Sequence, residues 1–354
     1  AAASDVIRSA AREARRWLAR SRPLGADAPH WAQAMYERSL LTIHALTSPT
    51  TGAVAAGARD GWAYVWPRDA ATAALALQAS GHRAEARRVA RFLADVDLAA
   101  AARFTETGAP VPGRAAQGDA AGWVAVAGRA TGISPPRGPF RWRDRADYQE
   151  SSPGTYLGNA LAAAADNVDG PKSAPYRGFS AHQHRGVARE FGTPRGLVRI
   201  AADPGSGLDS AAGWAVRPFE LTPLYPAAER TLRHLAHNRT PYGITPGEGW
   251  TGGKDPWTAP TAWSAWALAD LATARRTGSS GPRPNLHAVR EGEAHSSESL
   301  RQAALNLLLD LRHAATPAGD LPERVGVQTG IPTSTTPLLW SSAFAVLALR
   351  ELWP

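Results

Sequence analysis

Apolar residues recur along this chain at intervals of three and four, while segments that alternate apolar and polar residues are scarce. One apolar stripe comprises Leu300, Ala304, Leu307, Leu308 and Leu311. This spacing places the side chains on one face of a helix. Counted in the same way, the whole chain predicts about twelve helices. Their predicted ranges are 4–20, 29–47, 69–80, 83–99, 118–130, 155–167, 177–190, 208–217, 224–237, 258–276, 297–315 and 337–352.

Glycine and proline mark the breaks between these helices, and short and long connections alternate. The alternation predicts six helical hairpins closed into a ring, with inner helices rich in Ala and Leu and long loops at one end. The segment 278–296 is rich in Gly, Ser and Pro before it becomes charged, which indicates a surface loop. We therefore expect one all-α domain over residues 1–354, a size that closed barrels reach.

The positive charge of the chain comes almost entirely from arginine. The formal net charge is +8, the isoelectric point is about 10.3, and only Lys172 and Lys254 are lysines. The arginines are spread along predicted helices and are not interleaved with aromatic residues on a strand. This pattern favours solvated helix faces over the alternative of nucleic-acid binding. No run of about eighteen apolar residues is present, so we expect neither nucleic acid nor a membrane as a partner.

The chain has no cysteine, which excludes disulfides, thiolate metal sites and cysteine nucleophiles. Its first residues, Ala1-Ala2-Ala3-Ser4, lack a methionine, which suggests a processed N-terminus and export. The composition is equally compatible with the cytoplasm.

A glycine-rich segment at 247–252 has the Gly-x-Gly-x-x-Gly spacing of a dinucleotide-binding loop. It follows no predicted strand and opens no helix, so we predict no cofactor there. The alternative is a loop that presents Glu248 and Trp250 to a ligand.

Two glutamates far apart in the chain, Glu150 and Glu323, carry the most informative chemistry. Each lies in a polar break between predicted helices, within the segments 147–150 and 321–324. Two carboxylates on separate loops are the equipment for hydrolysis of a glycosidic bond. One donates a proton to the leaving oxygen while the other acts on water or on the sugar carbon. On local grounds alone, both glutamates are equally compatible with exposed acidic turns.

Sugar recognition is suggested by Trp66-x-Arg68-Asp69, which opens a predicted helix after an aromatic stretch. A carboxylate accepts hydrogen bonds from hydroxyl groups, a guanidinium donates them, and aromatic faces stack on a sugar ring. Asp69 also suits the N-cap of the helix, so both interpretations stand on local grounds. A second predicted helix start, with Asp119 and Trp123, offers the same choice.

Taken in order, these motifs resemble those of glycoside hydrolase family 15, the glucoamylase family. The matching segments are Trp66-Pro67-Arg68-Asp69, 117–123, 147–150, 321–325 and 337–341. The first resembles the family's Trp-x-Arg-Asp motif, and the second resembles its Gln-x-Asp helix start. The third resembles the acid-bearing loop, and the last two resemble the base-bearing loop and the final helix. The resemblance covers about residues 30–352, nearly the whole chain.

The resemblance implies an (α/α)6 barrel, without an N-terminal β-sandwich, and a set of site residues. Glu150 would be the general acid and Glu323 the general base, with Asp147 as a second carboxylate. The implied substrate-binding residues are Trp66, Arg68, Asp69, Asp119, Trp123, Tyr148, Glu248, Trp250 and Trp340. No metal or cofactor is implied.

Two departures from the family pattern bear on specificity. The acid loop, Trp-Glu-Glu in the family, here contains Gln149-Glu150-Ser151. In place of an arginine that many members direct at the leaving-group sugar, a later loop offers Thr245, Glu248 and Lys254. The chain looks most similar to compact members that act on isomaltose and dextran. We therefore expect an exo-acting, inverting α-glucoside hydrolase with α-1,6 preference. The alternatives are an α-1,4 glucoamylase, a trehalase and a catalytically silent carbohydrate-binding barrel.

Overall fold

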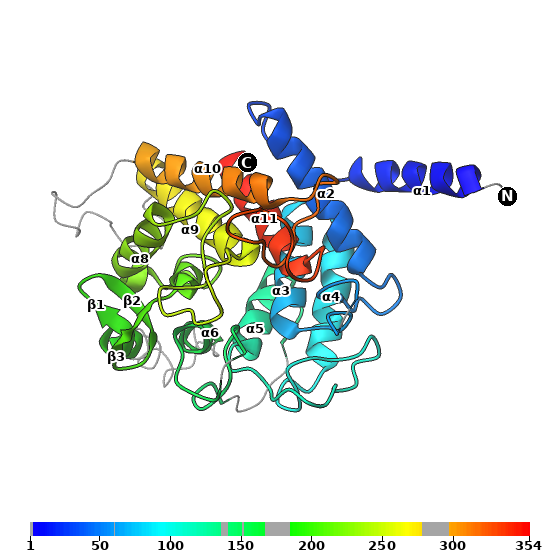
Figure 1. Cartoon of the computed structure of the whole chain (residues 1–354). Helices are drawn as coiled ribbons and strands as arrows, with labels where there is room; N and C mark the ends of the chain where they lie inside the picture. Colours follow the sequence, from blue (N-terminus) through cyan, green and yellow to red (C-terminus); the bar gives the residue numbers. More distant parts are fainter. Residues whose placement is uncertain (1–2, 60, 136–140, 151, 167–184, 278–296) are drawn as a thin grey trace.

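The computed structural model describes residues 3–59, 61–135, 141–150, 152–166, 185–277 and 297–354 (Figure 1). Its α-helices are α1 (Ala3–Leu18), α2 (His30–Leu46), α3 (Pro67–Ala79), α4 (Arg83–Asp95), α5 (Ala120–Thr131), α6 (Leu157–Asp166), α8 (Tyr225–His237), α9 (Thr258–Thr277), α10 (Ser297–Ala314) and α11 (Leu339–Leu352). Two short 3-10 helices are η2 (Ser210–Ala215) and η3 (Thr222–Leu224).

An inner ring of helices closes the molecule on itself. Going round the ring, α3 contacts α5, α5 contacts α6, α6 contacts η2, η2 contacts α9, α9 contacts α11, and α11 returns to α3. Outside the ring, α4 packs on α3 and α5, α8 packs on η2, α10 packs on α9, and α2 packs on α11 (Figure 1). The predicted (α/α)6 barrel is therefore confirmed, with six elements in this inner ring.

The sequence explains which helices lie inside the ring. Eleven of the thirteen residues of α3 and thirteen of the fourteen residues of α11 are buried, and both helices are rich in Ala and Leu. A helix that is apolar on all sides is stable only when neighbours surround it. In α4, by contrast, one face is buried through Ala86, Val89, Ala90, Phe92 and Leu93, and arginines occupy the other face.

Two predicted helices differ from the structure. The predicted α-helix at 208–217 is the short 3-10 helix η2, and its first turn is capped by the side chain of Asp209, which accepts a hydrogen bond from the backbone of Ala211. The predicted helix at 177–190 lies partly outside the described residues, while 185–191 are helical.

A small antiparallel sheet, absent from the prediction, precedes η2. It consists of β1 (Gly192–Thr193), β2 (Gly196–Ile200) and β3 (Asp203–Leu208), in the order β1-β2-β3. Val198 pairs with Leu208, and the register shifts before the next pair. The hairpin carries Arg199 on β2 and delivers Asp209 at the end of β3, and both residues face the candidate site.

The first helix lies outside the barrel. Figure 1 shows α1 projecting from the body of the molecule beside α2. Val6 and Ile7 on α1 are 61% and 68% exposed, whereas Trp17 near its end is buried against His44 and His82. The ring hairpins therefore begin with α2, and not with the first predicted helix. Among the described residues, no helix combines the length and apolar character needed to cross a bilayer.

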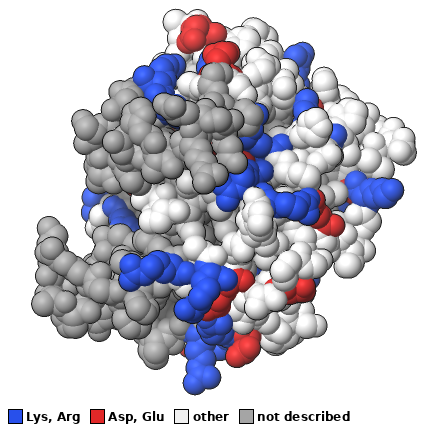
Figure 2. Space-filling model, turned by 90° about the vertical axis from the view of Figure 1, so that its left-hand side faces the viewer, with Lys and Arg blue, Asp and Glu red and all other residues white. Residues whose placement is uncertain are grey.

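Basic residues on the surface do not form one uninterrupted area on the face shown in Figure 2. There, Lys and Arg side chains are spread out, and acidic side chains lie beside several of them. Ion pairs such as Arg143–Glu190 and Arg195–Glu248 account for part of the arginine content.

Loops at the starts of the inner helices are joined to one another. Isolated β-bridges connect Gly57 with Leu338, Gln117 with Ala146, Tyr156 with Ile200, Asp209 with Gly247, and Trp257 with Arg324. These loops therefore meet at one end of the barrel, where the candidate site residues lie.

Candidate active site

The deepest part of the site is a buried arginine held between carboxylates. Arg68 follows Pro67 at the start of α3, where a proline suits the first turn. Its Nη1 donates to Gln117 Oε1 at 2.7 Å and to Asp119 Oδ2 at 3.1 Å, and its Nη2 lies 3.4 Å from Asp69 Oδ2. The guanidinium lies 4.4 Å from the centroid of the Trp340 ring. We call Arg68, Asp69 and Asp119 the inner clamp.

The inner clamp and Trp340 contain buried polar atoms that make no hydrogen bond within the described residues. Among the described residues, Arg68 Nε, Asp69 Oδ2, Asp119 Oδ1 and Trp340 Nε1 are buried and make no hydrogen bond. Burial raises the pKa of Asp69 to about 6, although Arg68 opposes the shift, and burial also raises the pKa of Asp119. Buried polar atoms left unpaired are costly, so their convergence indicates a place for ligand hydroxyl groups.

Glu323 lies next to the inner clamp on the loop between α10 and α11. Its backbone N–H donates to Thr335 at 2.9 Å, and its backbone carbonyl accepts from Thr258 at 3.0 Å. The side chain accepts a hydrogen bond from the Ser334 hydroxyl, and the residue is 6% exposed. Burial raises the pKa of Glu323, and Ser334 opposes this most, followed by Arg324 and Arg114. Glu323 also contributes to the raised pKa of Asp69, after the larger effects of burial and of Asp119.

Glu150 lies on the opposite loop, between α5 and α6. Its backbone φ is +55°, which is uncommon for a residue other than glycine, and its N–H donates to the carbonyl of Asp147 at 2.9 Å. The side chain is 34% exposed and forms an ion pair with Arg114. Arg114 also interacts electrostatically with Glu323. The two predicted catalytic glutamates therefore border the same guanidinium group.

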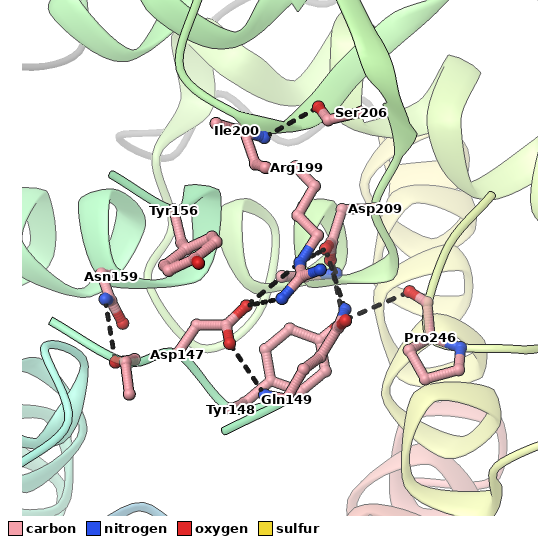
Figure 3. Close-up of polar contacts among 12 residues, drawn as sticks. Asp147, Tyr148, Gln149, Tyr156, Asn159, Arg199, Ile200, Ser206, Asp209 and Pro246 are labelled. Atoms are coloured by element: carbon pink, nitrogen blue, oxygen red, sulfur yellow. Dashed lines mark hydrogen bonds and ion pairs between the residues drawn. The ribbon is translucent and has the colours of Figure 1, made fainter. Parts of the chain in front are cut away.

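A buried polar cluster supports the loop that carries Glu150 (Figure 3). Arg199 donates from Nη2 to Asp147 Oδ2 at 3.0 Å, and its Nε lies 3.8 Å from Asp209 Oδ2. The other oxygen of Asp147 accepts the backbone N–H of Gln149 at 3.1 Å. The Tyr148 hydroxyl donates to Asp209 Oδ1 at 2.9 Å. Burial raises the pKa of Asp209 to about 7, with opposing contributions from the Ala211 backbone N–H and from Arg199.

The supporting cluster is connected to the inner clamp through Gln117. The side-chain amide of Gln117 donates to the backbone carbonyl of Asp147 at 3.2 Å, while its oxygen accepts from Arg68. The Tyr148 ring also lies 6.2 Å from Trp340, which stacks on Arg68. One continuous set of contacts therefore links β2, the Glu150 loop, the start of α5 and the start of α3.

The chain was compared with known proteins. Residues 31–108 match the model of glycosyl hydrolases family 15. A glycosidase variant in complex with glucose is 19% identical, with 91% of this chain and 97% of that chain covered and a TM-score of 0.70. The predicted resemblance to glycoside hydrolase family 15 is therefore confirmed over this segment, and the solved structure extends the similarity of fold to most of the chain.

Two further solved structures share the fold of this chain. The glucoamylase from Saccharomycopsis fibuligera is 14% identical, with coverage of 91% of this chain and 94% of that chain and a TM-score of 0.70. A bacterial glucoamylase complexed with acarbose is 17% identical, with coverage of 90% of this chain and 55% of that chain and a TM-score of 0.66. No curated protein matches the sequence.

Two of the predicted site residues are almost fully buried. Trp123 has no exposed surface and packs against Trp214, Phe219 and Phe344 in the barrel core. Asp147, predicted as a second carboxylate, is 1% exposed and forms an ion pair with Arg199.

The predicted ligand loop divides into two parts. Glu248 turns to Arg195 at 2.5 Å, to His234 at 2.8 Å and to the backbone of Leu208, so it stabilises the β-hairpin. Burial raises the pKa of Glu248, but the combined effect of these partners is larger and opposite. The pKa of Glu248 is therefore below its ordinary value. Trp250 lies 5.2 Å from Trp257 between ring centroids, and Trp257 forms a bridge with Arg324 beside Glu323. Trp250 therefore lies on the rim next to the base-bearing loop.

Arginines and tryptophans surround the outer part of the site. Trp66 is 2% exposed and stacks on Trp62 with 5.4 Å between ring centroids. Arg103 and Arg114 approach the Trp66 ring at 5.6 and 5.8 Å. Arg103, Arg114, Arg199 and Asp209 are not among the residues predicted from the sequence. Among the described residues, no group of three or more His, Asp and Glu is arranged to hold a metal ion.

Proposed function

We propose that this protein is an exo-acting, inverting α-glucoside hydrolase that releases β-glucose from the non-reducing ends of α-gluco-oligosaccharides. The observation that carries the proposal is the arrangement of Glu323 and Glu150 around one site, next to the inner clamp with its unpaired polar atoms. The match of residues 31–108 to the model of glycosyl hydrolases family 15 supports hydrolysis of a glycosidic bond. The complexes of structural neighbours with glucose and acarbose support a sugar ligand.

Glu323 is the proposed general base. It takes a proton from a water molecule, whose oxygen attacks the anomeric carbon of the terminal glucose. The bond between that carbon and the glycosidic oxygen breaks, and Glu150 donates its proton to the departing oxygen. Attack and departure on opposite faces of the sugar invert the anomeric configuration, so an α-glucoside gives β-glucose. The ionised base and the protonated acid are both required at the same time.

The gradient of burial supports exo action. Residues of the inner clamp are 5%, 3% and 1% exposed for Arg68, Asp69 and Asp119, whereas the Glu150 side chain is 34% exposed. A terminal glucose held by the inner clamp has its scissile bond at the two glutamates and its leaving group toward solvent. Trp340 and Tyr148 contribute an aromatic floor beneath this sugar.

We further propose a preference for α-1,6 linkages. The resemblance to compact isomaltose- and dextran-directed members supports this preference. The orientation of Glu248 toward Arg195 and His234 also removes one residue from the set that could contact the leaving sugar. Hydrolysis of α-1,4 linkages and of trehalose are the competing specificities, and one substrate panel separates all three.

The deciding experiment records the product anomer during cleavage of isomaltose, maltose, trehalose and dextran by proton NMR. We expect β-glucose as the first product, the highest kcat/KM on isomaltose among the disaccharides, and loss of activity in Glu323→Gln. Initial release of α-glucose would contradict inversion. Calorimetric binding of isomaltose without release of glucose would instead identify a silent carbohydrate-binding barrel.

A further inference from the structure

The connection between α4 and α5 directs two arginines to the outer part of the site. Arg103 lies 4.9 Å from the Tyr64 ring centroid and 5.6 Å from that of Trp66, and Arg114 lies 5.8 Å from that of Trp66. A guanidinium over an aromatic face is held in a defined place without losing its charge. The two groups are close enough that Arg103 lowers the pKa of Arg114, in addition to the larger effect of burial.

Arg114 interacts with both the proposed acid and the proposed base. It forms an ion pair with Glu150 and interacts with Glu323, and both side chains in the ion pair are about one third exposed, at 37% and 34%. An ion pair with a guanidinium stabilises the ionised form of a carboxylate. A general acid must instead be protonated when the substrate is bound. The ion pair between Arg114 and Glu150 must therefore open before Glu150 can donate a proton.

Arg103 has no acidic partner among the described residues. Its Nη1 donates to the backbone carbonyl of Gly61 at 3.2 Å, and its Nε is buried without a hydrogen-bond partner among the described residues. The guanidinium group thus packs beside Trp66 without a carboxylate from the described part of the chain. In such an environment, an anionic group of a ligand can complete the hydrogen bonds of the arginine in place of a protein carboxylate.

The charge balance also changes with the catalytic state. Glu150 pairs with Arg114, Arg324 and Arg114 lower the pKa of Glu323, and Arg103 lies close to Arg114. In the reactive state Glu150 is protonated, so Arg114 loses its anionic partner. A neutral leaving group supplies no replacement for this partner, whereas an acidic leaving group does.

We propose that the preferred substrate is an α-glucoside whose leaving group carries a carboxylate or a phosphate, which Arg114 and Arg103 bind. The acidic group replaces Glu150 as the partner of Arg114, so substrate binding itself releases Glu150 to hold its proton. The terminal glucose remains in the inner clamp, and the bond cleaved is the same. This inference rests on the proposed hydrolase function and specifies its substrate class.

The test compares matched neutral and acidic substrates. Isomaltose is paired with isomaltobionate, in which the leaving sugar carries a carboxylate, and trehalose is paired with trehalose 6-phosphate. We expect the acidic member of at least one pair to show a kcat/KM at least about tenfold higher, which corresponds to about 1.4 kcal/mol. The pair with the larger ratio identifies whether carboxylate or phosphate is preferred. The ratio should fall as sodium chloride is added, because salt screens exposed charges.

Variants assign the preference to the arginines. Arg114→Gln and Arg103→Gln should each lower the ratio of acidic to neutral kcat/KM by about tenfold, and Arg114→Lys should lower it less. The matched control is Arg87→Gln, which removes the same charge from an exposed position on the outer face of α4 and should keep the wild-type ratio. Thermal melting of each variant verifies that it is folded.

The outcomes separate this inference from the proposed function. Equal hydrolysis of neutral and acidic substrates by the wild type would overturn the inference and leave the hydrolase proposal standing. If no substrate releases glucose, the hydrolase proposal fails. Calorimetry then measures whether the protein binds isomaltobionate more tightly than isomaltose. Tighter binding of the acid that is lost in Arg114→Gln supports the inference, and equal or absent binding overturns it.

Discussion

The loops that carry the two glutamates are built differently. Glu323 is 6% exposed, its backbone is hydrogen-bonded on both sides to neighbouring segments, and its side chain accepts a hydrogen bond from Ser334. Glu150 is about one third exposed, has a left-handed backbone conformation, and pairs with a charged side chain from another loop. The base is thus held by hydrogen bonds to its own loop and to the start of α9, whereas the Glu150 side chain is held by an ion pair with Arg114.

The difference assigns separate tasks to the two loops. A base that must hold one water molecule in line with the anomeric carbon gains from a fixed position. The acid must give up its ion pair with Arg114 before it can hold a proton, so a partner that can move away from it is an advantage. The supporting cluster around Arg199 then fixes the backbone of the acid loop, so that only the Glu150 side chain needs to change its partner.

The largest expected effect distinguishes the roles of the two glutamates by changing the leaving group of the substrate. General acid or base catalysis contributes about 10²- to 10⁴-fold in rate. We expect both Glu323→Gln and Glu150→Gln to lose activity on isomaltose by about this factor. On α-glucosyl fluoride, whose fluoride departs without a proton, Glu150→Gln should recover to within about tenfold of the wild type, whereas Glu323→Gln should not. Initial rates of fluoride release measure both. Equal recovery of the two variants would contradict the assignment.

A second expected effect concerns the support of the acid loop. Removing Arg199 leaves Asp147 and Asp209 buried without their cation, and a broken buried pair costs about 3–5 kcal/mol. We expect Arg199→Gln to lower the free energy of unfolding by this amount in urea denaturation. The matched control, Arg143→Gln, breaks the exposed ion pair with Glu190 and should cost about 1 kcal/mol or less. Similar losses in both variants would mean that the acid loop does not depend on this cluster.

The pH dependence of stability tests the same cluster. The pKa of Asp209 is about 7 in the folded protein and about 3.9 for an unfolded aspartate. Between these values the folded state binds more protons than the unfolded state, so Asp209 makes the free energy of unfolding fall as pH rises from 4 to 7. In Asp209→Asn this fall should be smaller, by an amount on the order of a few kcal/mol. Denaturation at pH 4, 5.5 and 7 measures it, and an unchanged slope would refute the role of Asp209.

The smallest expected effect concerns the base. The Ser334 hydroxyl lowers the pKa of Glu323, against the larger opposite effect of burial. Ser334→Ala should therefore raise the pKa of Glu323 further, and the acid limb of the kcat/KM profile should move to higher pH, because the base must be ionised. A lost hydrogen bond to a charged group predicts about a tenfold lower rate at the acid end and little change at the plateau. An unshifted acid limb would show that another group controls it.

The ring and its inner helices followed from the sequence because helical periodicity and Ala-rich composition report directly on burial. The short helix η2 did not, since Asp209 caps a tight turn there and the apolar run of 210–215 does not distinguish a 3-10 helix from an α-helix. The β-hairpin before it was also missed. The alternation in Leu197-Val198-Arg199-Ile200, followed by Asp203-Pro204-Gly205, was the available signal.

Residues of the candidate site could be predicted only where they belong to a short sequence motif. Arg68 and Asp69 lie next to each other in the chain, and their pairing with Asp119 follows from two helix starts that face each other. Arg114 lies in an irregular loop, and Arg199 lies on a strand more than fifty residues from Asp147. Such pairings are fixed by the three-dimensional arrangement of segments, and local sequence carries no record of them.

The contact between α3 and α11 has a consequence for how the protein folds. Trp340, at the second position of α11, stacks on Arg68, at the second position of α3, and the long segment from α4 to α10 lies between these helices in the sequence. Contacts between residues so far apart in sequence carry a large entropic cost of loop closure and slow folding. We therefore expect the inner clamp to be completed only when the ring closes, so that sugar binding during refolding would report the closure of the barrel.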